Sequence, residues 1–243
     1  MTDVPAAQAL AVLAANDDRA TWQPAGFWRR YLAWSLDVLL LSPVLVWLVS
    51  PAVRESIAAV HQWVVSLQSW LLDRVVSADG AITDPFALAR LLLADPQQRT
   101  LLSEQMNRMG SAVLQAGLLV AGIAALYFIG FEASRWQATP GKRLLGLQVQ
   151  SEQGGRLGLA RTALRFFAGS LSWLSLNLGH ALAGWRKDGR ALHDLLAGAR
   201  VSAKGPMPAW ARTLLWAQVA LLLLVSVLML ARIFWMLGQL ATI

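Results

Sequence analysis

The sequence has 243 residues, of which 56% are hydrophobic and 14% charged, and its formal net charge is +7. A soluble core of this length needs far less apolar surface, so we expect lipid to cover part of the chain. The sequence contains no cysteine, which excludes disulfide frameworks, iron–sulfur ligation, thiolate zinc sites and cysteine nucleophiles.

Residues 1–25 are expected to form a cytoplasmic N-terminal tail. Asp3, Asp17 and Asp18 lie before the first apolar run, where a cleavable signal peptide would carry a basic leader, so we expect the first span to remain as an anchor. Each of three apolar runs approaches the ~20 residues that a spanning helix needs. The three predicted spans are residues 28–49, 111–131 and 213–235.

The stretch between the first two spans, residues 51–110, is predicted to be an outward-facing helical insertion, because its basic and acidic residues nearly balance. Apolar side chains recur at helical spacing over 57–71, which indicates an amphipathic helix on the membrane surface or against the spans. The alternative is a short additional span. Two Asp-Pro pairs, at 84–85 and 95–96, are typical of helix starts.

A fourth apolar run, residues 166–185, is interrupted by polar side chains that include Asn177 and His180. The loops before and after it are both strongly basic, and short basic loops are retained in the cytoplasm. A full crossing would place one of these loops outside, whereas a re-entrant or in-plane helical pair keeps both inside. We therefore predict a re-entrant segment, with a full crossing as the alternative.

The loop after the second predicted span carries a strand pattern. The Pro-Gly pair at 140–141 fits the centre of a type II turn. Alternating apolar residues then indicate a strand over 145–149 that continues as a β-hairpin through 157–159. The pattern becomes helical where Arg161 and Arg165 fall on one face.

Two short elements are predicted after the fourth apolar run. Residues 191–197 predict a helix that ends at Gly198, and residues 200–203 predict a strand. If this strand pairs with the one at 145–149, the two basic loops lie on the same side of the membrane. The expected fold is a mostly α, polytopic membrane protein with three transmembrane helices, a re-entrant helical segment and a small cytoplasmic β-hairpin element.

Three segments carry a resemblance to a known family. They are GFWRRYLAWSLD at 26–37, TPGKRLLGLQV at 139–149 and DGRALHDLLAGARV at 188–201. In this order they resemble motifs of the RDD family of integral membrane proteins, which is named for an arginine and two aspartates. By this resemblance the three residues are Arg30, Asp37 and Asp194.

The resemblance covers residues 26–49 and about 111–201. It implies an RDD-like membrane domain over 26–203 that contains the insertion, followed by a linker and a C-terminal span over 204–243. Where the family commonly has Thr after the Gly of the closing motif, this chain has Ala199. This departure puts a hydroxyl-dependent role at that position in doubt.

The charges at the three family positions need partners. Arg30 and Asp37 share a helical face but are separated by ~10 Å along the axis, too far for an easy direct pair. Arg30 can reach the interface or meet Asp194. An unpaired carboxylate in a bilayer is costly, so we expect Asp37 to be paired, protonated or exposed to a watery pocket. Its candidate partners are Lys142, Arg143 and Arg165.

Two functions are compatible with these residues. In the favoured one, the chain is a structural or assembly component whose Arg and Asp charges clamp the first span to the cytoplasmic loops. The alternative is a cation or proton transporter or antiporter component with a pathway through Arg30, Asp37, His193 and Asp194, because intramembrane carboxylates mark such routes. The resemblance implies this alternative too, since cation/proton exchange has been proposed for some family members.

We expect no enzymatic activity, no cofactor and no metal. Gly141 and Lys142 lack the Gly-rich lead and the following Ser or Thr of a phosphate-binding loop, and the three histidines have no ligand spacing. The positive charge lies beside the spans, where the lipid bilayer with its anionic headgroups is a sufficient partner and nucleic acid is not expected.

Protein partners compatible with the sequence are a second copy of the chain, since three spans enclose little volume for transport, or a membrane complex. The expected location is the bacterial inner membrane, with several spans and a cytoplasmic N-terminus.

Overall fold

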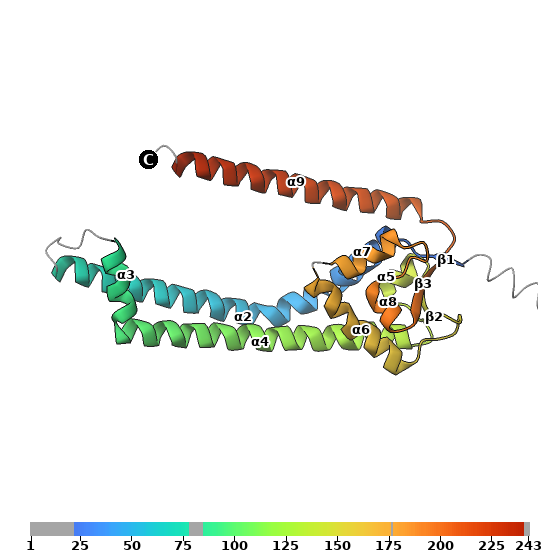
Figure 1. The fold of residues 1–243 in the computed structure, drawn as a ribbon, viewed down its shortest axis with the longest axis horizontal. Helices are drawn as coiled ribbons and strands as arrows, with labels where there is room; N and C mark the ends of the chain where they lie inside the picture. Colours follow the sequence, from blue (N-terminus) through green and yellow to red (C-terminus); the bar gives the residue numbers. More distant parts are fainter. Residues whose placement is uncertain (1–21, 78–84, 176, 241–243) are drawn as a thin grey trace, which may run out of the picture. The chain divides into compact units, whose positions relative to one another are not determined.

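The computed structural model describes residues 22–77, 85–175 and 177–240. It divides into two compact units: the sheet unit, Met1–Leu40 with Ala125–Ile243, and the insertion unit, Leu41–Ala124. The chain is mostly helical, as predicted, with one small sheet (Figure 1). In chain order the elements are β1 (Trp22–Pro24), α2 (Phe27–Ser77), α3 (Pro85–Ala94), α4 (Pro96–Ala133), α5 (Pro140–Leu144), β2 (Leu147–Ser151), α6 (Leu159–Leu174), α7 (Leu178–Trp185), α8 (Leu192–Leu196), β3 (Ala199–Lys204) and α9 (Ala209–Leu240).

Three helices in the described part of the chain are long and apolar enough to cross a membrane, and each contains one of the predicted spans. They are Phe27–Arg74, Pro96–Ala133 and Ala209–Gln239. Within their most apolar windows at most 17% of the residues are buried inside the protein. Such long apolar surfaces are those of helices that face lipid. The predicted class of polytopic helical membrane protein is confirmed.

The first helix is longer than predicted. α2 continues for 51 residues through Pro43 and Pro51, which corresponds to about 77 Å at 1.5 Å per residue. A bilayer hydrocarbon core is only about 30 Å thick. The stretch 57–71 is helical as predicted, but it continues α2 and does not form a helix of its own. Each of the two prolines removes one backbone hydrogen bond from the helix. The helix nevertheless continues past both prolines, and its sequence contains no glycine.

In the insertion unit, the Asp-Pro pair at 95–96 begins a helix as predicted. Asp95 Oδ1 accepts hydrogen bonds from the backbone N–H groups of Gln97, at 2.9 Å, and Gln98, at 3.2 Å, so it caps α4. Its Oδ2 accepts a bond from Trp70 Nε1 at 2.8 Å. α3 begins at Pro85, while Asp84, the other predicted cap, lies outside the described residues.

The sheet of the sheet unit has three antiparallel strands in the order β1-β3-β2. Val149 of β2 faces Val201 of β3, so the two distant strand regions pair, which the sequence raised only as a condition. Residues 157–159 do not add the hairpin strand that was predicted, since Leu157 packs in the core and α6 begins at Leu159. The strand that pairs with β2 is instead β3. β1, at the end of the expected N-terminal tail, was not predicted, and residues 1–21 of that tail lie outside the described residues.

One apolar core holds the sheet unit together. It includes fully buried side chains from α2, from both long strands and from the loops between them, and it reaches the first turns of α9. The largest of these side chains are Leu32, Leu145, Val149, Leu157 and Val201. α5 packs against β2 and α8 against β3 (Figure 1). The core therefore fixes α2, α5 and α8 relative to the sheet, and these three elements carry the motif residues.

The predicted fourth segment, residues 166–185, lies in two helices, α6 and α7, rather than in one long helix. Asn177 before α7 has a φ of +66°, and its N–H donates to the Ser172 carbonyl at 2.8 Å. The chain leaves the sheet after β2 and returns to it at β3. This helical pair is the form that a re-entrant or in-plane segment requires, and its placement in the membrane stays a prediction.

The contact between α6 and α7 generates a test of the fold. A Cβ added to Gly179 would overlap the Ser172 hydroxyl and lie 2.9 Å from the Ser172 Cβ. We expect Gly179→Ala to destabilise the protein by about 1–3 kcal/mol, because overpacking forces the helices apart. The measurement is the thermal unfolding midpoint in detergent. Gly169→Ala on α6 is the matched control, since its added Cβ meets nothing within 4 Å; equal midpoints for the two variants would contradict the close packing.

Candidate functional site

The arginine and the second aspartate of the family motifs form a buried ion pair. Arg30, in the first turn of α2, donates from Nη1 to Asp194 Oδ2 at 2.5 Å. Its other nitrogens donate to the carbonyl oxygens of Gly189, at 2.6 Å, and Ala25, at 3.0 Å. Asp194 is fully buried and also accepts the Ala191 N–H at 3.0 Å. Of the two predicted partners for Arg30, interface or Asp194, the structure has the aspartate.

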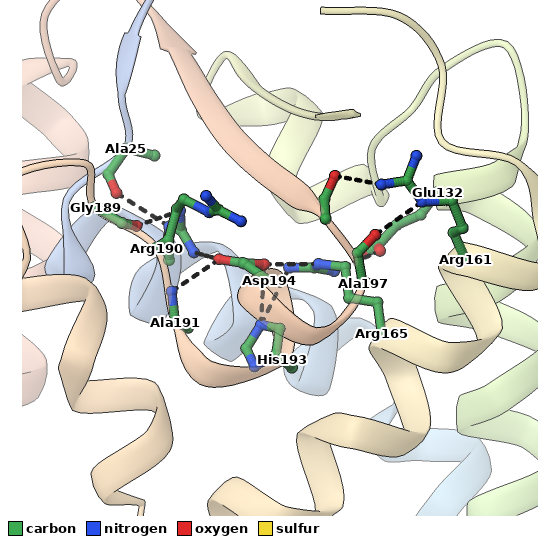
Figure 2. Close-up of polar contacts among 12 residues, drawn as sticks. Ala25, Glu132, Arg161, Arg165, Gly189, Arg190, Ala191, His193, Asp194 and Ala197 are labelled. Carbon is green, nitrogen blue, oxygen red and sulfur yellow. Dashed lines mark hydrogen bonds and ion pairs between the residues drawn. The ribbon is translucent and has the colours of Figure 1, made fainter. Parts of the chain in front are cut away.

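A second arginine extends this pair into a line of charges. Arg165 on α6 donates from Nε to Asp194 Oδ1 at 2.8 Å and from Nη1 to Glu132 Oε2 at 2.6 Å. Glu132 Oε1 forms an ion pair with Lys142 Nζ. Figure 2 shows Asp194 between Arg165 and the loop that carries Ala191. We call Arg30, Asp194, Arg165, Glu132 and Lys142 the charge network; its three cations and two anions leave a net charge of +1.

Burial and the network together set the ionisation of Asp194, Lys142 and His193, which lie outside the spans. Burial opposes ionisation of the Asp194 carboxyl, but the charges of Arg165 and Arg30 outweigh it and hold the pKa of Asp194 below its usual range. Burial lowers the pKa of Lys142 although Glu132 opposes that shift. Burial also lowers the pKa of His193 to about 3, with the Arg165 charge acting in the same direction. The His193 imidazole is therefore neutral at neutral pH.

The first family aspartate lies in a different environment from Asp194. Asp37 is fully buried, and its Oδ1 accepts from the Tyr127 hydroxyl and the Gly141 N–H, both at 2.7 Å. Its Oδ2 accepts from the Thr139 hydroxyl at 2.5 Å. These three donors are neutral. They belong to α4 and to the start of α5, so Asp37 ties α2 to both elements.

The predicted cationic partners of Asp37 are therefore wrong. Lys142 and Arg165 bind Glu132 instead, and the Arg143 guanidinium lies over the Trp136 ring at 4.5 Å. The reason is the local backbone at the start of α5, which places the Gly141 N–H and the Thr139 hydroxyl against the Asp37 carboxylate. These neutral donors occupy the positions in which a lysine or arginine of the loop was expected.

The predicted type II turn at 140–141 is also wrong. Pro140 and Gly141 begin α5, with Thr139 as the N-cap that accepts the Lys142 N–H at 3.4 Å. Gly141 lies against α2 so closely that an added Cβ would be 2.8 Å from Asp37 Oδ1 and would overlap the Ala33 carbonyl. Only glycine permits this approach.

The predicted helical face with Arg161 and Arg165 is confirmed, because both side chains reach the α8 region. Arg161 donates to the carbonyl oxygen of Ala197 at 2.9 Å (Figure 2) and to that of Gly198 at 2.8 Å. These carbonyls end the short helix α8, where a cation is favourable. α6 therefore holds α8 at Asp194 and again at its C-terminus.

Several important residues were missed from the sequence. Arg29, next to Arg30, donates to the carbonyl oxygens of Leu145, at 2.9 Å, Lys204, at 3.2 Å, and Gly205, at 2.7 Å. The doubled arginine of the first motif was the available signal for it. Glu132 was signalled only as an acidic residue at the end of an apolar run. Tyr127 and Thr139 gave no signal, because neutral hydroxyls are common in such segments.

The chemistry of this site is that of fixed ion pairing. Each oxygen of Asp37, Glu132 and Asp194 accepts at least one hydrogen bond or ion pair from a protein donor. Among the described residues, no group of three or more His, Asp or Glu side chains is arranged to hold a metal ion. A carboxylate whose oxygens are all bound to protein donors is a poor ligand for a further cation.

The ion pairs generate a stability test. We expect Asp194→Asn to destabilise the protein by about 3–5 kcal/mol, because it leaves the buried Arg30 without a counter-charge and Arg165 with only Glu132. Asp188→Asn is the matched control, since Asp188 pairs with Arg186 at the surface and such pairs contribute little. Denaturant unfolding in detergent micelles measures both. Equal stabilities of the two variants would mean that the network does not hold the sheet unit together.

Comparisons with known proteins agree with this placement of the motifs. The family model described as "RDD family" matches residues 24–198, which include Arg30, Asp37 and Asp194. The chain is 27% identical over 179 residues to a Bacillus subtilis (strain 168) protein named "Uncharacterized protein YxaI", a match that covers 74% of this chain and 97% of that protein. No solved structure matches the chain. Since the family model covers most of the chain and includes all three motif residues, the chain belongs to the RDD family.

Proposed function

We propose that the protein is a non-enzymatic structural or assembly component of the bacterial inner membrane. In this role the charge network locks the beginning of the first span onto α5, α6 and α8. The observation that carries the proposal is the unbroken line of ion pairs from Arg30 through Asp194, Arg165 and Glu132 to Lys142. These residues come from five different elements, so the line supports a clamp for the whole sheet unit.

The contacts favour a clamp over a proton or cation pathway. A migrating cation would have to displace Arg30 or Arg165 from Asp194, or Lys142 from Glu132, and each displacement would leave a buried charge without its partner. His193 is neutral and packed beside Arg165, which disfavours proton uptake there. Transport through Asp37, whose partners are neutral donors, is the alternative function.

The same proposal includes a topology. Both basic loops and the N-terminus lie in the cytoplasm, the insertion lies outside, and residues 166–185 re-enter or lie in the membrane plane. The hydrogen-bonded ladder between β2 and β3 supports this arrangement, because two strands of one sheet cannot lie on opposite sides of a bilayer.

Asp37→Asn separates assembly from transport. The amide replaces an acceptor oxygen with an N–H₂ group that faces donors, which costs about 1–3 kcal/mol, so we expect less protein in the membrane than for wild type. The exposed Asp73→Asn is the control. Quantitative immunoblotting of membranes measures the abundance of each variant.

Flux measurements complete this test. We expect purified wild-type protein in vesicles to dissipate neither a Na⁺ gradient, a K⁺ gradient nor a proton gradient above the rate of empty vesicles. If wild type supports an ion flux that Asp37→Asn abolishes at equal protein content, the assembly proposal is wrong and the protein is a transporter.

Single cysteines test the topology directly, because the sequence has no native thiol. We expect Lys204→Cys, at the end of β3, and Gln153→Cys, after β2, to react with a membrane-impermeant maleimide only in inside-out vesicles. Glu104→Cys in the insertion should react only in intact, right-side-out vesicles or spheroplasts. Labelling of position 204 from the outside alone would overturn the re-entrant arrangement.

A further inference from the structure

The sheet unit contains a cavity of about 500 Å³ next to the charge network. All of its lining residues belong to the sheet unit. Ligand pockets commonly have volumes of about 300–1,000 Å³. The apolar part of its wall includes five aromatic rings, which come from the start of α2, the end of α4 and from α6. They are Phe27, Tyr31, Trp34, Phe128 and Phe166.

The polar part of the cavity wall carries an excess of positive charge. Arg30, Lys142 and Arg165 line it, while Glu132 is the acidic residue among the lining side chains. Asp194 lies behind this wall, bound by Arg30 and Arg165. Because the whole network has a net charge of +1, one anionic group in the cavity would neutralise it.

A buried imidazole with one nitrogen that has no hydrogen-bond partner lines the same cavity. His193 lines it and exposes 8% of its surface, and its Nδ1 has no hydrogen-bond partner. Its Nε2 lies 3.3 Å from Arg165 Nη2, in a hydrogen bond, and also 3.3 Å from Asp194 Oδ1. We assign the imidazole proton to Nδ1, because the guanidinium only donates and Nε2 therefore accepts the hydrogen bond from Arg165. A buried N–H without an acceptor costs free energy that a ligand oxygen would recover.

We propose that this cavity binds one anionic phospholipid drawn from the surrounding bilayer. The headgroup phosphate accepts the His193 Nδ1–H and neutralises the network beside Lys142, and the first part of an acyl chain lies along the aromatic wall. A phospholipid fits better than a free anion because the wall beside the cations is mostly apolar and lies in a membrane protein. The site is independent of whether the protein assembles a complex or transports an ion.

Native mass spectrometry of the full chain in detergent tests the proposal. We expect one phosphatidylglycerol to remain bound per protein, and phosphatidylcholine with the same acyl chains to bind at least about tenfold more weakly, because it carries no net charge. Equal retention of the two lipids would overturn recognition of an anionic headgroup. Displacement of the lipid by millimolar inorganic phosphate would mean that the site takes a free anion, which would also overturn the proposal.

Two variants test whether the lipid binds in this cavity. Ala181→Phe fills the cavity from α7 without changing a member of the network, and His193→Gln removes the imidazole donor; we expect each to reduce phosphatidylglycerol binding about tenfold or more. The exposed Ala121→Phe on α4, which does not line the cavity, is the control. Gel filtration establishes that each variant is folded. Wild-type binding by a folded His193→Gln, or by a folded Ala181→Phe, would move the lipid elsewhere and sink the proposal.

Discussion

The burial of Asp194 is the constraint on which the sheet unit depends. A carboxylate that is 0% exposed must be held by donors, and here Arg30 and Arg165 approach its two oxygens from α2 and α6. Since Asp194 lies in α8, directly before β3, both arginines also fix where the last strand of the sheet begins. The ion pairs thus connect a helix that enters the membrane with a sheet built from segments far apart in the sequence.

The first motif acts through three points along one helix. Arg30 faces α8 and the Gly189 turn, whereas the adjacent Arg29 binds the carbonyl oxygens at the end of β3. Asp37, two turns further, holds the N-terminus of α5 through Thr139 and Gly141. Neighbouring residues on a helix point about 100° apart, so two consecutive arginines can bind different parts of the unit. The spacing of the motif thus reflects three contacts rather than one triad.

The sequence predicted what depends on hydrophobic pattern and on formal charge. The spans and the strands at 145–149 and 200–203 follow from such signals, and Asp194 was one of the two partners considered for Arg30. The partners of Asp37 could not be found in this way, because Tyr127, Thr139 and a backbone N–H bear no charge. The continuation of α2 through Pro43 and Pro51 could not be predicted either, because proline usually, but not always, ends or kinks a helix. Strand β1 has three residues, too few for a periodic pattern.

A network of this kind contributes more to specificity than to net stability. Buried ion pairs lose most of their attraction to desolvation, and well-packed apolar residues of the same volume often do as well. An apolar contact, however, tolerates sliding, whereas Asp194 is satisfied only when α2, α6 and α8 are all in place. Misdocked arrangements leave a charge buried and unpaired, so the network selects one arrangement of the sheet unit. The remaining charge of +1 beside an aromatic cavity then gives that single arrangement a defined binding chemistry.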